Sequence, residues 1–544
     1  MTISSGRSTI RSVVLALAAA ALMVTGVVAV VARPTTALAA AGVEDEGADC
    51  PVTLPGSLPA TSRLPDPFRK IDGARISTTS EWRCRRAEIK ELAERYVYGE
   101  KPAKPASVTG TVSSTGITVN VSHNGRSASF SAGVQLPTGG GSGPYPAVVV
   151  LGGLGADTAT IRASGAAVIS YDPLAVGREG TPRTNKQGAF YTIYGSSSST
   201  GLLLAWAWGV SRIIDVIEQS GGGVLRADAT GVTGCSRYGK GAFVTGAFDQ
   251  RIALTMPIES GSGGAPIFRG IPGESGAQPL SSAYGEQPWL GDAFSAFTGN
   301  PTTLPVDTHE MVAMVAPRGL FLMENPHIAW LAARSGSVAA LGGAEVYKAL
   351  GAGPNISYWS DVQDGTHCAA RPEWRTPLQQ SIQRFLLNTG SAPGAMRISS
   401  RAAGNLADWR DWTTPTLTGG PPTNPPTTPP TTPPTNPPTD PPTNPPTGGA
   451  CTASVSLNQW TGGFVATIRV TAGTSPVTGW TVAATLPSGA TITNSWNANR
   501  SGTTGAVQFT NVAYNGSIAP GQSTEFGFQA TGTGTGLTPT CSAG

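Results

Sequence analysis

The chain has 544 residues, which is too long for one domain and suggests roughly two or three folded units. Charged residues make up only 13% of it, the formal net charge is +3, and no basic cluster with interleaved aromatic residues is found. Nucleic acid is therefore not expected as a partner, because phosphate recognition requires such a basic surface.

The first 39 residues have the layout of a secretory signal peptide. Arg7 and Arg11 precede an apolar stretch over 13–32, and the small-residue sequence Ala37-Leu38-Ala39 follows. The stretch, about 20 residues long, could alternatively span a membrane as an anchor. Its alanine-rich composition and the A-x-A site favour cleavage. We therefore expect a secreted, extracellular protein with no membrane contact after cleavage.

Six cysteines are expected to form disulfides in such an oxidising compartment. Sequence alone allows many pairings, and the positions of the cysteines suggest one set. The suggested pairs are Cys50–Cys84, Cys235–Cys368 and Cys451–Cys541. None of the six has the C-x-x-C spacing of a zinc site, so we expect neither a metal nor another cofactor.

Helix and strand patterns alternate between residues 81 and 387, after a proline-rich stretch over 40–80. The predicted helices cover 81–96, a strongly amphipathic 202–218, 243–248 and 372–387. A hairpin over 117–121 and 128–136 precedes predicted strands at 145–151, 166–171, 231–233, 251–258, 319–323 and 356–361. The strand at 145–151 leads into the glycine-rich loop Gly152-Gly153-Leu154-Gly155. This alternation predicts a mostly parallel sheet with helices on both faces, an α/β fold.

The sequence T-G-C-S-R-Y-G-K-G-A over 233–242 places a serine between a predicted strand and a predicted helix. Such a turn exposes the Ser236 hydroxyl beside backbone N–H groups at a helix N-terminus, where developing negative charge is stabilised. The motif is similar to the nucleophile elbow of α/β-hydrolases, G-x-S-x-G. It departs from that pattern because Gly239 comes three residues after the serine and Arg237 follows it directly.

A serine nucleophile needs a base that removes its proton and a third group that orients the base. His367 follows the last predicted strand, where the order Ser, acid, His places the base. A Cys235–Cys368 disulfide would join the residue before the serine to the residue after this histidine. His123 falls in the hairpin, ahead of the sheet. We interpret His309 and His327 as structural or peripheral.

Two glutamates compete to orient His367. Glu259 follows the first strand after the nucleophile helix, and Glu324 follows the next strand, which is the more usual location in hydrolases. The glycines at 261, 263 and 264 suit a tight catalytic loop and favour Glu259, but the residues alone leave both glutamates open.

The last part of the chain differs in composition. Residues 413–449 are Pro-Pro-Thr repeats with Asn and Asp, which predict an extended polyproline II linker that could reach roughly 100 Å. Residues 450–544 are rich in Thr, Gly, Val and Ser, with alternating segments at 464–470 and 480–486 that predict a β-sandwich. The expected parts are 1–39 signal peptide, 40–412 catalytic domain, 413–449 linker and 450–544 β-sandwich module.

Four motifs together resemble those of the glucuronoyl esterases, carbohydrate esterase family fifteen. They are T-G-C-S-R-Y-G-K at 233–240, P-I-E-S-G-S-G-G at 257–264, G-E-Q-P-W at 285–289 and G-T-H-C at 365–368. The resemblance covers about residues 50–387 and implies an α/β-hydrolase three-layer sandwich. It implies cleavage of esters that join 4-O-methyl-glucuronic acid on xylan to lignin alcohols.

The resemblance also implies site residues. The family's catalytic triad falls on Ser236, Glu259 and His367, and its oxyanion arginine falls on Arg237. Its sugar-binding residues fall on Lys240, Gln278, Glu286 and Trp330. From the residues alone, Lys240 could instead be a surface lysine, Trp330 a core aromatic and Glu286 a helix cap.

Residues 451–541 resemble a family two carbohydrate-binding module. The similar segments are N-Q-W-T-G-G-F at 458–464, G-W at 479–480, S-W-N at 495–497 and Y-N-G at 514–516. The resemblance implies a flat strip of aromatic rings that stacks on cellulose, because aromatic faces suit the apolar faces of sugars. The strip falls on Trp460, Trp496 and Tyr514, whereas Trp480 is expected in the core.

The sequence therefore predicts a secreted, monomeric serine esterase that acts on a glucuronoxylan–lignin ester and is targeted to a cellulose surface. An acetyl xylan or feruloyl esterase with the same triad is an alternative. A non-catalytic wall-binding protein is a third possibility, against which the intact Ser236, Glu259 and His367 argue.

Overall fold

The structure is a computed structural model, and it describes residues 43–419, 451–460, 462–496, 498–512 and 515–543. These residues form two compact units, one before and one after the gap at 420–450. The predicted signal peptide and most of the predicted linker lie outside the described residues. No helix in the described ranges is long and apolar enough to cross a membrane.

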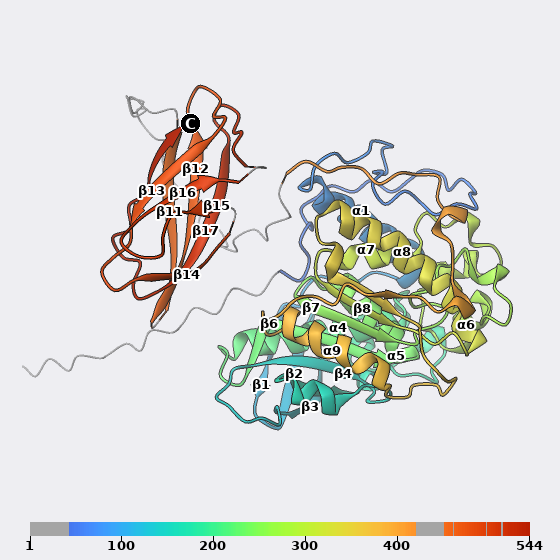
Figure 1. The fold of residues 1–544 in the computed structure, drawn as a ribbon. Helices are drawn as coiled ribbons and strands as arrows, with labels where there is room; N and C mark the ends of the chain where they lie inside the picture. Colours follow the sequence, from blue (N-terminus) through green and yellow to red (C-terminus); the bar gives the residue numbers. More distant parts are fainter. Residues whose placement is uncertain (1–42, 420–450, 461, 497, 513–514, 544) are drawn as a thin grey trace, which may run out of the picture. The chain divides into compact units, whose positions relative to one another are not determined.

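A ten-stranded sheet runs through the larger unit (Figure 1), in the order β1-β2-β3-β5-β4-β6-β7-β8-β9-β10. The strands are β1 Ser107–Val112, β2 Gly116–His123, β3 Arg126–Gln135, β4 Tyr145–Leu151, β5 Ala167–Tyr171, β6 Leu225–Cys235, β7 Ile252–Ile258, β8 Gly319–Met323, β9 Ile356–Trp359 and β10 Met396–Arg397. In this order, the strands β5, β4, β6, β7, β8, β9 and β10 are each parallel to their neighbours. The strands β1, β2 and β3 add an antiparallel edge. The predicted hairpin is therefore part of the sheet and not ahead of it, because β3 pairs with β5.

Helices cover both faces of this sheet. They are α1 Glu81–Ala93, α2 Thr158–Ala163, α3 Ala189–Tyr194, α4 Leu202–Gln219, α5 Arg237–Phe248, α6 Leu280–Glu286, α7 Thr308–Val315, α8 Ala333–Ala349 and α9 Pro372–Phe385. Alternate residues of β4 belong to two different cores. Val149 packs in the core that includes α4 and α5, and Val148 packs in the core that includes α2 and α9. The result is the expected three-layer α/β sandwich.

The predicted helix at 202–218 is present as α4, and its polar residues between Ser211 and Gln219 share one face as expected, but most of that face is buried as well. Every residue of α4 from Leu202 to Ile217 is buried, including Arg212 and Asp215. The helix packs on β1, β2 and β6 beside α5, which itself packs on β6 and β7, so that neighbours cover it on all sides. Arg212 and Asp215 are tolerated there because they form an ion pair at 3.1 Å.

The larger unit extends beyond residue 412, where the sequence places the start of the linker. Thr418 pairs with Thr78 in a parallel bridge, and its N–H donates to the Ser77 carbonyl at 2.9 Å. Arg75 Nη2 donates to the Thr413 carbonyl, and Leu417 is buried. Residues 413–418 are thus packed against the rest of the larger unit.

The smaller unit is a β-sandwich, as predicted, with two four-stranded antiparallel sheets. One sheet contains β11 Cys451–Trp460, β12 Gly463–Ala472, β17 Ser523–Thr531 and β14 Thr491–Trp496, and the other contains β15 Ala498–Arg500, β16 Ala506–Asn511, β13 Trp480–Thr485 and β18 Thr540–Ala543. Trp480 is buried between the sheets, and its ring stacks on Phe526 with centroids 5.1 Å apart. The expectation of a core position for Trp480 is confirmed.

The three disulfides join the pairs that cysteine position suggested. They are Cys50–Cys84, Cys235–Cys368 and Cys451–Cys541. The first two lie within the larger unit, and the third joins the first and last strands of the smaller one.

Candidate active site

Ser236 is the single residue between β6, which ends at Cys235, and α5, which begins at Arg237. Its backbone has φ 59° and ψ −126°, an uncommon conformation for a residue with a side chain, and its N–H donates to the Ile258 carbonyl at 2.9 Å. Gly239 comes one position later than the second glycine of G-x-S-x-G, and a glycine is required there for steric reasons. A Cβ on Gly239 would lie 2.4 Å from that same carbonyl oxygen. The turn is therefore a sharp, strained elbow despite its departure from G-x-S-x-G.

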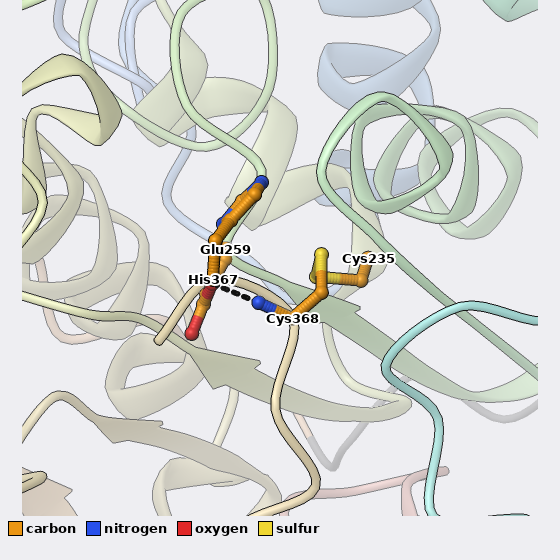
Figure 2. Close-up of side chains that lie close together, drawn as sticks. All are labelled: Cys235, Glu259, His367 and Cys368. Atoms are coloured by element: carbon orange, nitrogen blue, oxygen red, sulfur yellow. Dashed lines mark hydrogen bonds and ion pairs between the residues drawn. A yellow bond between two sulfur atoms is a disulfide. The ribbon is translucent and has the colours of Figure 1, made fainter. Parts of the chain in front are cut away.

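His367 and Glu259 lie in direct contact (Figure 2). The imidazole Nδ1 is 2.6 Å from Glu259 Oε2, and the Cys368 N–H donates to the same oxygen at 2.8 Å. Asn325 Nδ2 donates to the other oxygen, Oε1, at 3.3 Å. Glu259 is fully buried, whereas the His367 side chain is 30% exposed. Glu259 can therefore fix the orientation of a histidine whose ring is accessible from outside.

The Cys235–Cys368 disulfide links the nucleophile elbow to the histidine loop (Figure 2), with a Cα–Cα distance of 5.8 Å. In the described part of the chain, no hydrogen bond joins the Ser236 hydroxyl to His367. Contacts of this kind often tighten only when a substrate is bound. The two cysteines lie in one cluster with Glu259 and His367. Both sulfurs are consumed by the disulfide, so the cluster lacks the thiolates that a zinc site of this composition requires.

Glu324, the competing acid, has a different environment. It is buried, and its Oε1 accepts a hydrogen bond from the Ser260 hydroxyl at 3.3 Å. Burial and then the negative charge of Glu259 raise the pKa of Glu324 to about 8. Glu324 is therefore mostly uncharged at neutral pH, and the structure brings Glu259 to the histidine instead.

The turn that carries Glu259 has the backbone that its glycines predicted. Glu259 itself has φ 46°, and Gly261 and Gly263 have φ 61° and 87°. These left-handed conformations fold the chain back over Ser260, whose carbonyl accepts a hydrogen bond from Lys240 Nζ at 2.5 Å.

Lys240 and Arg237 extend from the first turn of α5 toward one indole ring. Lys240 is buried, with its Nζ 5.3 Å from the Trp289 ring centroid, and Arg237 lies 5.5 Å from the same centroid. Burial lowers the pKa of Lys240 to about 8, although Glu286 and Glu324 oppose the shift. Lys240 is thus not an ordinary surface lysine.

A chain of polar contacts connects the remaining predicted residues. Gln278 Nε2 donates to Glu286 Oε2 at 2.8 Å, and Glu286 Oε1 lies 3.8 Å from Arg237 Nη2. Arg237 Nη1 in turn donates to Glu179 at 3.0 Å. Gln278, Glu286 and Arg237 therefore lie together beside the elbow.

Trp330 lies over the catalytic histidine candidate. Its ring is 53% exposed and meets the His367 ring edge-on, with centroids 6.0 Å apart. Its carbonyl accepts a hydrogen bond from the Gln278 N–H at 3.2 Å. Trp330 is therefore not a core aromatic, and its exposed face is available to a ligand.

Several residues of the site were not identified from the sequence. Trp289 belongs to the G-E-Q-P-W motif, but the sequence assigned it no function. In the structure, its Nε1 donates a hydrogen bond to Glu179 at 2.6 Å. Arg371 is buried, its Nη2 donates to the Thr366 carbonyl at 2.6 Å, and its Nε lies 3.7 Å from Glu259 Oε1. Neither Glu179 nor Arg371 belongs to a motif, so only their contacts in space identify them.

The expected cellulose-binding residues cannot be placed in the same way. Trp460 and Trp496 end strands β11 and β14, but their side chains are outside the described part of the smaller unit. Tyr514 lies wholly outside the described residues.

Comparisons with known proteins identify the family of the chain. The fungal glucuronyl esterase family matches residues 119–351, and the cellulose binding domain matches residues 450–543. The 4-O-methyl-glucuronoyl methylesterase of Hypocrea jecorina is 37% identical over 378 residues, which are 68% of this chain and 80% of that protein. The protein of the same description from Neurospora crassa is 38% identical over 392 residues, 71% of this chain and 97% of the other.

Solved structures show the same relationship. The glucuronoyl esterase catalytic domain of Hypocrea jecorina has a TM-score of 0.63 at 36% identity and covers 67% of this chain and 100% of that one. A variant of the Sporotrichum thermophile enzyme, solved with methyl 4-O-methyl-beta-D-glucopyranuronate, also has a TM-score of 0.63 at 36% identity, with 68% and 100% coverage. The chain belongs to the glucuronoyl esterase family and carries a cellulose-binding domain after its catalytic domain.

Proposed function

We propose that this esterase hydrolyses the bond between (4-O-methyl-)glucuronic acid of glucuronoxylan and a lignin alcohol, with Ser236 as nucleophile, His367 as general base and Glu259 as the orienting acid. The observation that carries the assignment is the 2.6 Å contact between His367 Nδ1 and buried Glu259, on a loop that a disulfide ties to the residue before Ser236. The relative solved with a methyl glucuronate ester supports the substrate class.

In this mechanism the Glu259 carboxylate accepts a hydrogen bond from Nδ1–H of His367, which leaves Nε2 unprotonated and free to take the Ser236 proton. The serine oxygen then attacks the ester carbonyl. Arg237 and backbone N–H groups at the start of α5 stabilise the oxyanion. His367 protonates the departing alcohol, and water attacks the acyl-enzyme by the same route in reverse.

The sugar would be held by the residues grouped beside the elbow. Lys240, Gln278 and Glu286 offer charged or amide partners to the hydroxyl groups of the uronate, and Trp330 offers an exposed ring. The contacts of Glu286 with Gln278 and with Arg237 keep these polar groups paired before the sugar arrives, which limits the conformational entropy lost on binding.

We also propose that the protein is secreted as a monomer after loss of residues 1–39, and that the module binds cellulose through Trp460, Trp496 and Tyr514. The disulfides support maturation in an oxidising compartment. N-terminal sequencing of the exported protein and its mass in solution test the first two statements.

The reaction is tested by turnover of benzyl glucuronate against acetyl xylan and feruloylated xylan. We expect hydrolysis of the glucuronate ester alone, and a fall in kcat of about 10⁴- to 10⁶-fold in Ser236→Ala, the range seen when a triad serine is removed. Circular dichroism of the variant should match that of the unaltered protein. Turnover of acetyl or feruloyl esters in place of the glucuronate would support the alternative esterase, and absence of all turnover would support a non-catalytic protein.

A further inference from the structure

The glycine-rich loop after β4 carries an exposed leucine that the proposed mechanism does not use. In the described part of the chain, four large apolar side chains are exposed: Leu154 at 56%, Trp330 at 53%, Val43 at 40% and Leu54 at 37%. A single exposed leucine is ordinary. Here, however, the two most exposed side chains lie on loops that reach the same catalytic elements.

Both ends of the loop are pressed against residues next to the catalytic candidates. A Cβ on Gly152 would lie 2.2 Å from the ring of Tyr238, two residues after the nucleophile. A Cβ on Gly155 would lie 2.6 Å from Cys235 Cβ and 3.1 Å from Cys368 Cβ. Only glycine fits at these two points, so the loop is fixed on the elbow and on the disulfide, with Leu154 exposed between them.

The strand order separates two sides of the site. β4 is the neighbour of β6 on one side, and β7 and β8 follow on the other. Of the proposed sugar-binding residues, Trp330 follows β8 and its carbonyl accepts a hydrogen bond from the Gln278 N–H, whereas Glu286 reaches back to Arg237, the residue after the serine. With the ester carbonyl at Ser236, at the end of β6, a sugar in contact with Trp330 lies on the β8 side, which leaves its alcohol facing the loop after β4.

We propose that Leu154 forms the subsite for the apolar part of the leaving alcohol and sets the preference of the enzyme for bulky alcohols. This inference rests on the proposed function. The alcohol oxygen must reach His367, whose neighbour Cys368 is bonded to Cys235, and the loop packs on both sulfur-bearing residues. An aryl or alkyl group that continues outward from this oxygen meets the leucine side chain and removes its apolar surface from water.

The test compares a methyl glucuronate ester with a benzyl or phenylpropyl glucuronate ester. In Leu154→Asn, the ratio of kcat/KM for the bulky ester to that for the methyl ester should fall about tenfold, the scale of a lost apolar pocket contact. Leu154→Met, which keeps a similar apolar area, should retain the ratio. Leu54→Asn, at an exposed leucine of the N-terminal stretch, is the matched control and should leave the ratio unchanged.

The outcomes separate the subsite from the reaction. An unchanged ratio in Leu154→Asn, or an equal loss on both esters, overturns the subsite while the proposed function stands. A fall in the ratio that also appears in Leu54→Asn overturns it as well. Failure of the unaltered protein to hydrolyse either ester overturns the proposed function and the subsite with it.

Discussion

Glu259 and Glu324 are two buried glutamates at the ends of neighbouring strands, and their partners make them chemically different. Glu259 accepts hydrogen bonds from the Cys368 N–H and from Asn325, and it contacts His367. Glu324 has one hydrogen-bond donor, Ser260, and its Oε2 has no partner among the described residues. Hydrogen bonds to both oxygens stabilise a carboxylate, whereas burial without them favours the protonated form.

This difference predicts that replacement by glutamine lowers kcat strongly at position 259 and only slightly at position 324. Glu259→Gln should lower kcat on benzyl glucuronate by about 10³- to 10⁴-fold, since the amide cannot hold the imidazole in the required tautomer as a carboxylate does. Glu324→Gln is the matched control and should lower kcat by less than about tenfold, because an amide resembles a protonated carboxyl. A large loss in Glu324→Gln with activity retained in Glu259→Gln would reverse the assignment.

The raised pKa of Glu324 also predicts how stability depends on pH. The folded protein holds this proton up to a pKa of about 8, whereas the unfolded chain releases it near 4.5. The stabilisation is therefore complete below pH 4.5 and is lost as the pH rises through about 8. Urea unfolding midpoints of the unaltered protein should fall across this window by more than those of Glu324→Gln. Equal slopes for the two proteins would contradict the prediction.

At the scale of elements, the nucleophile elbow and the histidine loop are linked covalently. The Cys235–Cys368 bridge joins residues 133 apart in sequence, and the Cys50–Cys84 bridge joins residues 34 apart. Replacing the first pair by alanine should lower the free energy of unfolding by about 2–4 kcal/mol. It should also lower kcat, because Ser236 and His367 adjoin these cysteines. Replacing the second pair is the control that tests stability alone. Unchanged kcat in the first variant would show that packing already positions both loops.

Strands at the centre of the sheet were predictable because their residues are buried on both sides. The bounds of β4 and β8 match the predicted ranges 145–151 and 319–323. The edge strands β1 and β10 were missed for the opposite reason. Most residues of β1 are exposed, and β10 has only two residues, so neither leaves a hydrophobic pattern. Such strands are defined by their pairing partners and not by their own sequence.

Five helices were also missed, namely the short α2, α3 and α6 and the longer α7 and α8. The glycines of α8 obscure its helical pattern, but they have a packing reason: a Cβ on Gly343 would lie 2.2 Å from Val312 on α7. The start of α7 does have a sequence signal, a capping box formed by Asp307 and Glu310. Ser236 and His367 were easier to find, since each follows a predicted strand, but the same position fits Glu324 as well as Glu259, and only the family resemblance decided for Glu259. Glu179 and Arg371 belong to no such pattern.

At the scale of the whole molecule, the catalytic domain ends later than composition indicates. Trp412 is buried, its ring lies 6.0 Å from that of Phe68 and 6.2 Å from that of His309, and residues 413–418 continue across the same domain. Composition misplaces this boundary because residues 413–418 are rich in threonine and proline, like the Pro-Thr repeats that follow. They therefore resemble the linker in sequence, although they pack against the domain.

A pair of truncations tests both this boundary and the module. A chain that stops at residue 419 should keep full turnover of a soluble glucuronate ester and lose retention on microcrystalline cellulose in a pull-down. A chain that stops at residue 411 should unfold more easily by about 3–5 kcal/mol, because it lacks the buried Trp412. Equal unfolding midpoints for the two, or cellulose retention by the first, would contradict the assignment of these segments.

The bridge between residues 235 and 368 has one more consequence. A protease that nicks the backbone once inside the intervening segment produces two fragments, yet the sulfur–sulfur bond still holds the fragment with Ser236, the proposed nucleophile, to the fragment with His367, the proposed base. Nicked enzyme should migrate as one band without reductant and as two bands with it. Damage of this kind would therefore leave both halves of the proposed catalytic apparatus on one particle.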